Sequence, residues 1–332
     1  MHLDAQQPII LQDYLRQRGW LDTEEVITSL EKPGEGNMNY TLRIITPNRA
    51  FIVKQSRGYV EKYPTIAAPA ERAVTEGRFY QTIQRIPKLA RQMPHLLGID
   101  EKNNLLVLED LGAASDFTHL YQPCRLLSES DALALTEYLS DLHGQFLTHN
   151  PDVAFANLGM RALNNEHITN YPFLEDNGFD LNTIQPGLQA LAMPYKRDAD
   201  LKKTVQALST VYLAEEHPSK PVTLLHGDYY PGSWLQTASG TKIIDPEFCF
   251  FGPAEFDLGV MMAHLMMAEQ PPTVLNTVLS NYQPTTGFDE RLRQQFTGVE
   301  IMRRLIGLAQ LPLSLSLDRK RSLLDDAYFL LS

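Results

Sequence analysis

The sequence predicts an α+β protein with two lobes, a small N-terminal lobe built on an antiparallel sheet and a larger, mainly helical C-terminal lobe. The length of 332 residues exceeds what one hydrophobic core usually serves. Strand-like runs and turn residues dominate between Val26 and Val53, whereas helical spacing of apolar residues dominates after Gly112. We therefore expect a boundary near residue 110, with lobes at residues 1–110 and 111–332.

The N-terminal lobe is predicted to begin with a helix and to continue as an antiparallel meander. Residues 9–20 carry apolar side chains at helical spacing and close beside Gly19. The turn PGEGNMN then leads into the strands YTLRIIT and FIVK, which the turn PNRA separates. A helix is expected over 69–85, followed by an apolar strand in LLVLEDLG.

The C-terminal lobe is predicted from three segments with apolar residues at helical spacing, at 128–148, 200–214 and 255–268. The stretch 150–195 is punctuated by Pro, Gly and Asn, so we expect it to be irregular and to lie at the surface. Two strand-like runs, VTLLHGD and TKIIDPE, interrupt the helices, and each ends in a carboxylate.

Composition excludes several classes of function. The 40 acidic residues outnumber the 29 basic ones, giving a formal charge of -11, and no Lys/Arg-rich run could follow a phosphate backbone, which argues against a nucleic-acid partner. No apolar stretch approaches the roughly 18 to 20 residues that span a bilayer, so no membrane partner is expected. The two cysteines, Cys124 and Cys249, fit a reducing compartment, and we expect a cytoplasmic location.

The strongest local signal is a pair of acidic motifs. His226 and Asp228 stand in HGD, and Asp245 and Glu247 stand in DPE, 17 residues after Asp228. Phosphoryl transfer needs one carboxylate to accept a hydroxyl proton and others to hold Mg²⁺ against nucleotide phosphates. Ser233 could bind the metal or position the loop. The alternative is that these are ordinary turn residues at strand ends, since Asp and Gly favour turns.

A second signal is the pair formed by Lys54, which ends an apolar strand, and Glu76 on the following helix. A strand lysine paired with a helical glutamate holds nucleotide phosphates in kinase folds. Taken alone, a lysine after FIV is usually just a solvated side chain, and only its position relative to the other motifs favours the phosphate role.

A third signal is the Gly/Asn turn with Gly34, Gly36, Asn37 and Asn39. Glycine permits a close approach of the backbone to phosphate, and asparagine tolerates positive φ. A simple β-hairpin would use the same residues. The chain contains no G-x-x-x-x-G-K-[ST] motif, which argues against a P-loop enzyme.

The fourth signal is the pair Arg303 and Arg304 within the apolar helical stretch EIMRRLIGLAQ. Two guanidinium groups there indicate either a polar cavity with an oxygen-rich ligand or a salt bridge between helices. Asp257, in EFDLGVMMAH, is expected to brace the catalytic loop through buried hydrogen bonds.

Along the chain the motifs occur in the order Gly/Asn turn, strand lysine, helical glutamate, HGD and DPE. This order resembles that of the aminoglycoside phosphotransferase and choline kinase superfamily, which has a protein-kinase-like bilobal fold. Within it the chain is most similar to the 5-methylthioribose kinases. The resemblance runs from about residue 31 to 309 and rests on EGNMNYTLRI, VKQSRGYV, ERAVTEGRF, VLEDLG, GFDLNTIQPGLQ, HGDxxxGS, DPEFCFFGPAEFDLG and RRLIGLA. DPE and Ser233 are the two features specific to that branch.

The resemblance implies ATP as phosphoryl donor, Mg²⁺ as metal and a small hydroxylated metabolite as acceptor. It implies a role for each matching residue: Asp228 with His226 and Ser233 in catalysis, Asp245, Glu247 and Ser233 at the metal, Lys54 with Glu76 at the phosphates, Glu109, Asp110 and Leu111 as the hinge at adenine, and Arg303, Arg304 and Tyr230 at the sugar.

Three alternatives stay open at this point. The family's catalytic loop normally reads HGDLHTGS, whereas Tyr229, Tyr230 and Pro231 fill its variable positions here, so the acceptor could instead be an aminoglycoside, choline or a homoserine-type alcohol. The arginine pair disfavours cationic acceptors. A catalytically silent binding protein would lack an acid at the base or metal position, and a metal hydrolase would need a second histidine at ligand spacing. The oligomeric state is open, a homodimer being one alternative.

Overall fold

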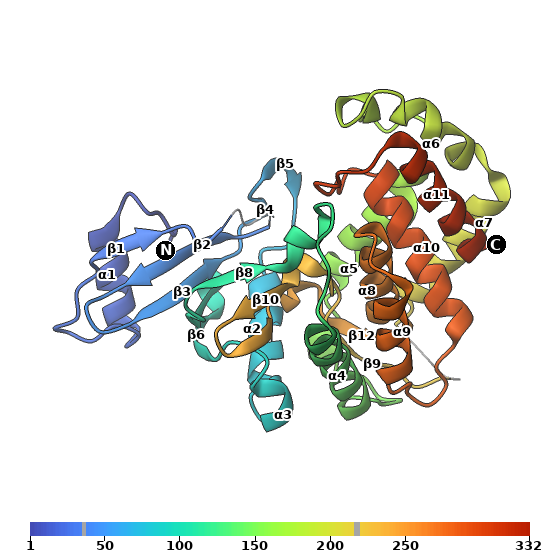
Figure 1. The fold of residues 1–332 in the computed structure, drawn as a ribbon. Helices are drawn as coiled ribbons and strands as arrows, with labels where there is room; N and C mark the ends of the chain where they lie inside the picture. The colour runs from blue at the N-terminus through green and yellow to red at the C-terminus, as the bar shows by residue number, and fades with distance from the viewer. Residues whose placement is uncertain (35–37, 216–219) are drawn as a thin grey trace. The chain divides into compact units, whose positions relative to one another are not determined.

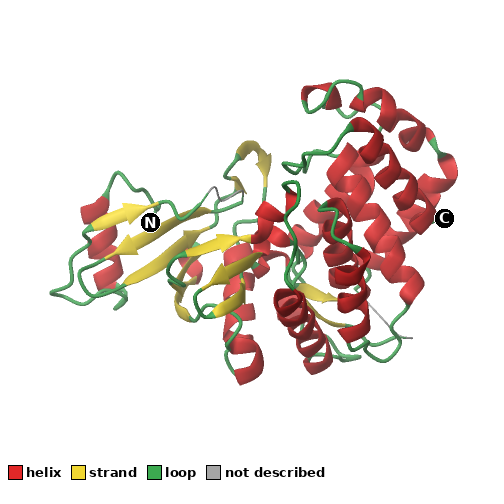
Figure 2. Ribbon diagram, viewed as in Figure 1, coloured by secondary structure: helices red, strands yellow, loops and turns green. Residues whose placement is uncertain are grey.

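The computed structural model describes residues 1–34, 38–215 and 220–332 (Figure 1). The chain divides into two compact units, and each is described by itself. The first unit comprises Met1–Ser115 and Gln236–Phe248, and the second comprises Asp116–Leu235 and Cys249–Ser332. Strands and helices are both abundant, as Figure 2 shows, which confirms the predicted α+β class.

The first unit is built on a five-stranded antiparallel sheet of order β1-β2-β3-β7-β6. Its strands are β1 (Ser29–Glu31), β2 (Tyr40–Ile45), β3 (Ala50–Gln55), β6 (Leu96–Asp100) and β7 (Leu105–Glu109). The unit also holds a hairpin formed by β4 (Tyr59–Val60) and β5 (Tyr63–Ala67). A separate three-stranded sheet has the order β11-β10-β8 and consists of β8 (Ala114–Asp116), β10 (Trp234–Thr237) and β11 (Gly240–Ile243). The predicted meander is therefore present, with β7 inserted between β3 and β6.

Helices cover both faces of this sheet. Helix α1 (Pro8–Gln17) buries Leu11 and Leu15 in one cluster with Val53 of β3. Helix α2 (Arg72–Ile83) lies on the other face, where a Cβ at Gly77 would come within 3 Å of Leu106 on β7. Helix α3 (Pro87–Ala90) follows α2. Because side chains alternate along a strand, the residue after Val53 points to the face that α2 covers.

The second unit is mainly helical, and most residues of its large hydrophobic cluster come from α6, α7, α8, α10 and α11. Its helices are α4 (Glu129–Gln145), α5 (Leu158–Asn165), α6 (Leu188–Arg197), α7 (Ala199–Leu213), α8 (Glu255–Met267), α9 (Pro272–Asn281), α10 (Glu290–Ile306) and α11 (Leu317–Leu331). The short strands β9 (Thr223–Leu225) and β12 (Phe250–Gly252) pair antiparallel. Among the described residues, no helix is long and apolar enough to cross a membrane.

The helices predicted at 128–148, 200–214 and 255–268 are α4, α7 and α8. Side chains that accept backbone hydrogen bonds cap two of them at the N-terminus, Ser128 for α4 and Asp198 for α7. The prediction that 150–195 is irregular was wrong. That stretch contains α5, a π-helical turn at Glu166–Asn170 and α6. In α6, burial of apolar residues outweighs the cost of the internal Pro194.

Helices α8 and α10 approach closely at Gly259, where an added Cβ would lie 2.8 Å from the Cβ of Phe296 and 3.0 Å from the carbonyl oxygen of Arg293. We expect Gly259→Ala to lower the free energy of unfolding by about 1–3 kcal/mol through overpacking. Gly144→Ala is the matched control, because a Cβ at this exposed position on α4 would meet no described atom within 4 Å apart from its chain neighbours and the nearby backbone of its own helix. There alanine should stabilise by up to about 1 kcal/mol. Urea unfolding measures both, and equal stabilities would contradict the close helix contact.

Candidate active site

In the first unit, a buried lysine on β3 joins two carboxylates. Lys54 follows Val53 and so faces α2, where its Nζ donates to Oε1 of Glu76 at 2.9 Å. The same Nζ donates to Oδ1 of Asp245 at 2.5 Å. Burial alone would lower the pKa of Lys54, but attraction by Asp245, Glu76 and Glu247 outweighs it and raises the pKa. The ammonium group therefore stays charged at neutral pH.

The carboxylates of this group outnumber its cations. Asn39 donates to Oε2 of Glu247 at 2.8 Å, and Nε of Arg72 lies 3.2 Å from the same oxygen. Burial raises the pKa of Glu76 and of Glu247, although Lys54 and Arg72 oppose the shift. Two positive side chains thus face three acidic ones, and burial favours the protonated forms of Glu76 and Glu247.

The backbone at Asp245 is strained. Its φ is 64°, a left-handed conformation that non-glycine residues rarely adopt, and its N–H donates to the hydroxyl of Tyr80 at 3.4 Å. The side chain is 46% exposed, whereas Glu247, two residues later in the turn Pro246–Phe248, is buried. One carboxylate therefore faces solvent and the other stays fixed inside.

This donor set fits a magnesium ion. Mg²⁺ in phosphoryl-transfer sites is usually held by one or two carboxylates together with waters and phosphate oxygens, not by an all-protein cage. Asp245 and Glu247 supply two carboxyl groups where acidic side chains outnumber cations, and a bound cation would favour the ionised form of Glu247. No group of three or more His, Cys, Asp or Glu side chains suited to a metal occurs among the described residues.

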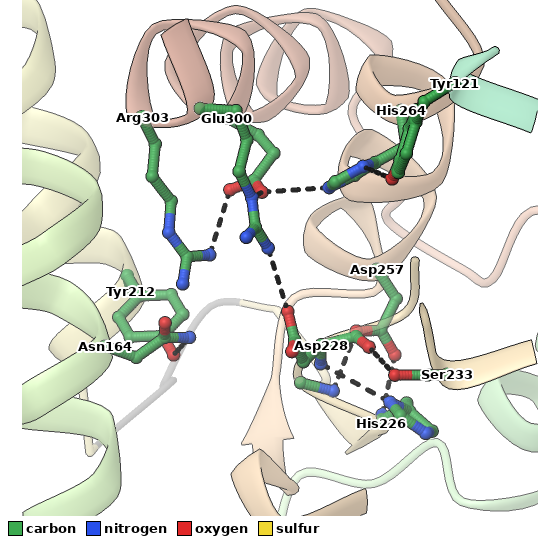
Figure 3. A network of polar contacts seen from close by, with 12 residues as sticks. Tyr121, Asn164, Tyr212, His226, Asp228, Ser233, Asp257, His264, Glu300 and Arg303 are labelled. Atoms are coloured by element: carbon green, nitrogen blue, oxygen red, sulfur yellow. Dashed lines mark hydrogen bonds and ion pairs between the residues drawn. The ribbon is translucent and has the colours of Figure 1, made fainter. Parts of the chain in front are cut away.

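In the second unit, the loop after β9 is fixed through its main chain. The N–H groups of His226 and Gly227 donate to Oδ2 and Oδ1 of Asp257 at 2.7 and 3.0 Å. Asp257 is fully buried on α8, as expected of a brace, and Nε2 of His143 lies 3.3 Å from its Oδ2. Ser233 donates from Oγ to the carbonyl oxygen of Asp228 at 2.9 Å, which closes the loop (Figure 3).

The side chain of Asp228 faces the C-terminal part of α10. Nη2 of Arg304 lies 3.4 Å from Oδ1 of Asp228, and Nε of Arg304 donates to Oε1 of Glu300 at 2.6 Å. Arg303 donates from Nη1 to Oε2 of Glu300 at 3.1 Å (Figure 3). Burial would raise the pKa of Glu300, but Arg303, Arg304 and His264 outweigh it and lower the pKa well below its usual range. Glu300 is therefore a buried anion between two guanidinium groups.

A sequence model of the phosphotransferase enzyme family matches residues 29–293 of this chain. The chain belongs to the phosphotransferase enzyme family. It is 29% identical over 272 residues to a methylthioribose kinase of Exiguobacterium sibiricum and 26% identical over 274 residues to one of Bacillus cereus strain G9842. These matches cover 77% and 76% of this chain and 65% and 64% of the relatives, so the matched part spans less than two thirds of their length. The predicted resemblance is confirmed.

Solved structures of a choline kinase and of a spectinomycin phosphotransferase share the fold. Choline kinase LicA from Streptococcus pneumoniae superposes with a TM-score of 0.54 at 14% identity, covering 98% of this chain and 99% of that one. A spectinomycin phosphotransferase in complex with ADP and spectinomycin gives 0.51 at 13% identity, covering 100% and 98%. At these identities the likeness concerns the fold alone, and it confirms the predicted protein-kinase-like class.

The other predicted site residues lie as follows. Gly36 and Asn37 lie outside the described residues, Gly34 is exposed, and Asn39 is buried against Glu247. At the end of β7, Oε2 of Glu109 accepts from the N–H of His95 at 3.0 Å, and Oδ2 of Asp110 accepts from Nε of Arg43 at 2.7 Å. Leu111 follows in the chain. Contact of this segment with adenine stays a prediction.

Sequence reasoning missed several residues of these groups, among them Arg72, Glu300 and His264. Arg72 is fully buried, and besides Glu247 it donates to the carbonyl oxygens of Met38 and Pro69 at 2.7 Å each, which fixes the chain next to the Gly/Asn turn. Glu300 and His264 complete the group at α10. The signal for Glu300 was a charged residue within the apolar helical stretch EIMRRLIGLAQ. Arg72, in a segment with three other charged residues (ERAVTEGRF), and His264 carried no such signal.

Proposed function

We propose that this chain is an ATP-dependent kinase that phosphorylates a hydroxyl group of a small metabolite, with 5-methylthioribose as the first candidate acceptor. The single observation that carries the proposal is the carboxylate of Asp228, which lies 3.4 Å from Nη2 of Arg304 in a loop whose preceding residues, His226 and Gly227, donate their N–H groups to Asp257. An acid fixed in this way suits proton acceptance from an alcohol. Membership of the family and the methylthioribose kinase relatives support the reaction class.

Within this proposal the first unit holds the nucleotide. Lys54, kept charged and oriented by Glu76, donates to the phosphate oxygens of ATP. Asp245 and Glu247 would hold Mg²⁺, which supplies positive charge that neutralises the phosphates when it is bound. Ser233 already donates to the main chain of Asp228, so its loop-closing role is better supported than direct metal binding. We also propose a cytoplasmic location, which the use of ATP supports.

The chemistry then falls to Asp228. Its carboxylate accepts the proton of the acceptor hydroxyl as the hydroxyl oxygen attacks the γ-phosphorus of ATP. The bond from that phosphorus to the β,γ-bridging oxygen breaks, and ADP leaves. Main-chain hydrogen bonds from His226 and Gly227 to Asp257 keep the loop in one conformation. That restraint places the carboxylate before the substrate arrives, which reduces the reorganisation needed in the reaction.

Charge balance favours a neutral, hydroxyl-rich acceptor. Arg303 and Arg304 contribute two positive charges, which Glu300 and Asp228 match with two negative ones. A polyol keeps this balance and accepts hydrogen bonds from Arg303. A polycationic aminoglycoside or choline would instead add positive charge beside a guanidinium group.

A transfer assay with radiolabelled ATP tests the proposal. The panel is methylthioribose, ribose, homoserine, choline and kanamycin, each with and without EDTA. We expect phosphorylation of methylthioribose that EDTA abolishes. Turnover of choline or kanamycin without methylthioribose would overturn the choice of acceptor, and nucleotide binding without turnover of any alcohol would favour a silent binding protein.

A further inference from the structure

Two arginines that are adjacent in sequence have different surroundings in the structure. Arg303 has one intrahelical bond to Glu300, and its buried Nε has no hydrogen-bond partner among the described residues. Arg304 is engaged at both ends of its guanidinium group, by Glu300 at Nε and by Asp228 at Nη2. The guanidinium carbon of Arg304 also lies 5.0 Å from the ring centroid of Tyr230. Arg303 therefore retains an N–H group that can donate a hydrogen bond to a ligand, whereas the guanidinium group of Arg304 already contacts the carboxylates of Glu300 and Asp228.

Glu300, which accepts a hydrogen bond from Arg304, is also contacted by a histidine on α8. Nε2 of His264 on α8 lies 3.1 Å from Oε1 of Glu300, and Nδ1 lies 2.6 Å from the hydroxyl of Tyr121 (Figure 3). An ionised carboxylate only accepts hydrogen bonds, so the proton of neutral His264 is on Nε2, and Tyr121 donates to Nδ1. This fixes the direction of every bond from Tyr121 to Glu300.

His264 stays neutral in this position. Burial lowers its pKa to about 4, although the hydrogen bond to Glu300 opposes the shift. The other charged or titratable groups facing it are Tyr121, Tyr230, Arg303 and Arg304. A neutral imidazole has one donor and one acceptor, so it can link a hydroxyl to a carboxylate in one orientation only.

The same chemistry occurs a second time at the catalytic loop. The hydroxyl of Tyr282 lies 2.8 Å from Nδ1 of His143, whose Nε2 lies 3.3 Å from Asp257. That Tyr–His–carboxylate set holds the main chain of the loop. The set formed by Tyr121, His264 and Glu300 reaches the loop's acidic side chain through Arg304.

We propose that Tyr121, His264 and Glu300 form a relay that positions Arg304 on Asp228, so that Arg304 is a positioning residue for the catalytic base and Arg303 alone of the pair binds the acceptor. The proposal rests on the proposed function and refines it, because the two arginines were expected to share the sugar. The alternative is that Tyr121, His264 and Glu300 only stabilise the packing of α8 on α10.

Steady-state kinetics with methylthioribose separates the two arginines. Arg303→Met should raise the acceptor KM at least tenfold with kcat within about threefold of wild type. Arg304→Met should lower kcat about 100-fold with a smaller change in KM. An equal effect of both variants on KM, with kcat intact, would overturn the division of roles.

The relay itself is tested at His264. We expect His264→Leu to lower kcat about tenfold, His264→Gln, which keeps a donor toward Glu300, to recover most of it, and Tyr121→Phe to lower it about threefold. The double variant His264→Leu/Arg304→Met should be no slower than Arg304→Met, because both changes remove one function. Additive losses would overturn the relay. Tyr195→Phe is the matched control, since it removes a 2.6 Å bond to Asp325 away from this group and should leave kcat within twofold.

A measurement without turnover keeps the relay testable if the proposed acceptor is wrong. Nitrogen-15 NMR should show His264 protonated at Nε2, and the Nε–H signal of Arg304 should exchange slowly with solvent. We expect His264→Leu to abolish that protection and Tyr195→Phe to retain it. Unchanged protection in His264→Leu would refute the relay whether or not the protein phosphorylates a sugar, whereas failure of the transfer assay alone would refute only the proposed function.

Discussion

Replacing Asp228 with Asn is expected to lower kcat by about 10³-fold, within the range that general bases contribute. The substitution keeps the shape of the side chain and removes its ability to accept the hydroxyl proton. The main-chain brace is unaffected, because Asp257 binds the N–H groups of His226 and Gly227 and not the Asp228 side chain. The residues proposed to hold ATP belong to the other compact unit, so the nucleotide dissociation constant should change less than threefold.

Two measurements check this result: release of ADP in the presence of acceptor, and calorimetric titration with a nonhydrolysable ATP analogue. Asp326→Asn on the exposed side of α11 is the control for a loss of one negative charge and should match wild type. A variant at Asp228 that kept more than a tenth of the wild-type kcat would remove this residue from the role of base.

The fold could largely be predicted because periodicity and turn chemistry act locally. The meander followed from alternation and Gly/Asn turns, and the helices α4, α7 and α8 followed from apolar spacing. The same reasoning failed for the stretch 150–195, because its short helices and its π-helical turn are interrupted by turn residues. Short elements carry too few periodic positions to outweigh the signal of Gly, Asn and Pro.

The site could be predicted only in part. Lys54 and Glu76 were expected to meet because a strand and the next helix bring them together, and they do. Sequence spacing does not show that Arg72 meets Glu247, far along the chain, or that His264 of α8 meets Glu300 of α10. Helical periodicity shows which side of a helix is buried, but which side chains meet depends on how two helices are packed in register.

Replacing Lys54 with Met is expected to destabilise the first unit by about 3–5 kcal/mol, the range seen when one partner of a buried ion pair is removed. The variant leaves Glu76, which is fully buried, without the cation that faces it. Adding Glu76→Gln should restore at least half of the loss, because an amide costs less to bury than a carboxylate. Chemical unfolding measures both variants, and the exposed Lys102→Met serves as the control.

The pH dependence of that loss distinguishes an unpaired carboxylate from a simple packing defect. Burial already raises the pKa of Glu76 in the folded protein, and without Lys54 it should rise further. A carboxyl group whose folded pKa exceeds its unfolded value takes up a proton on folding, so its contribution is favourable at low pH and is lost as pH rises through the folded pKa. The deficit of Lys54→Met should therefore stay level up to about pH 8, the pKa of Glu76 with Lys54 in place, and grow above it, whereas that of Lys54→Met/Glu76→Gln should stay level throughout. A deficit of the same size at every pH would mean that the buried charge of Glu76 is not what Lys54 compensates.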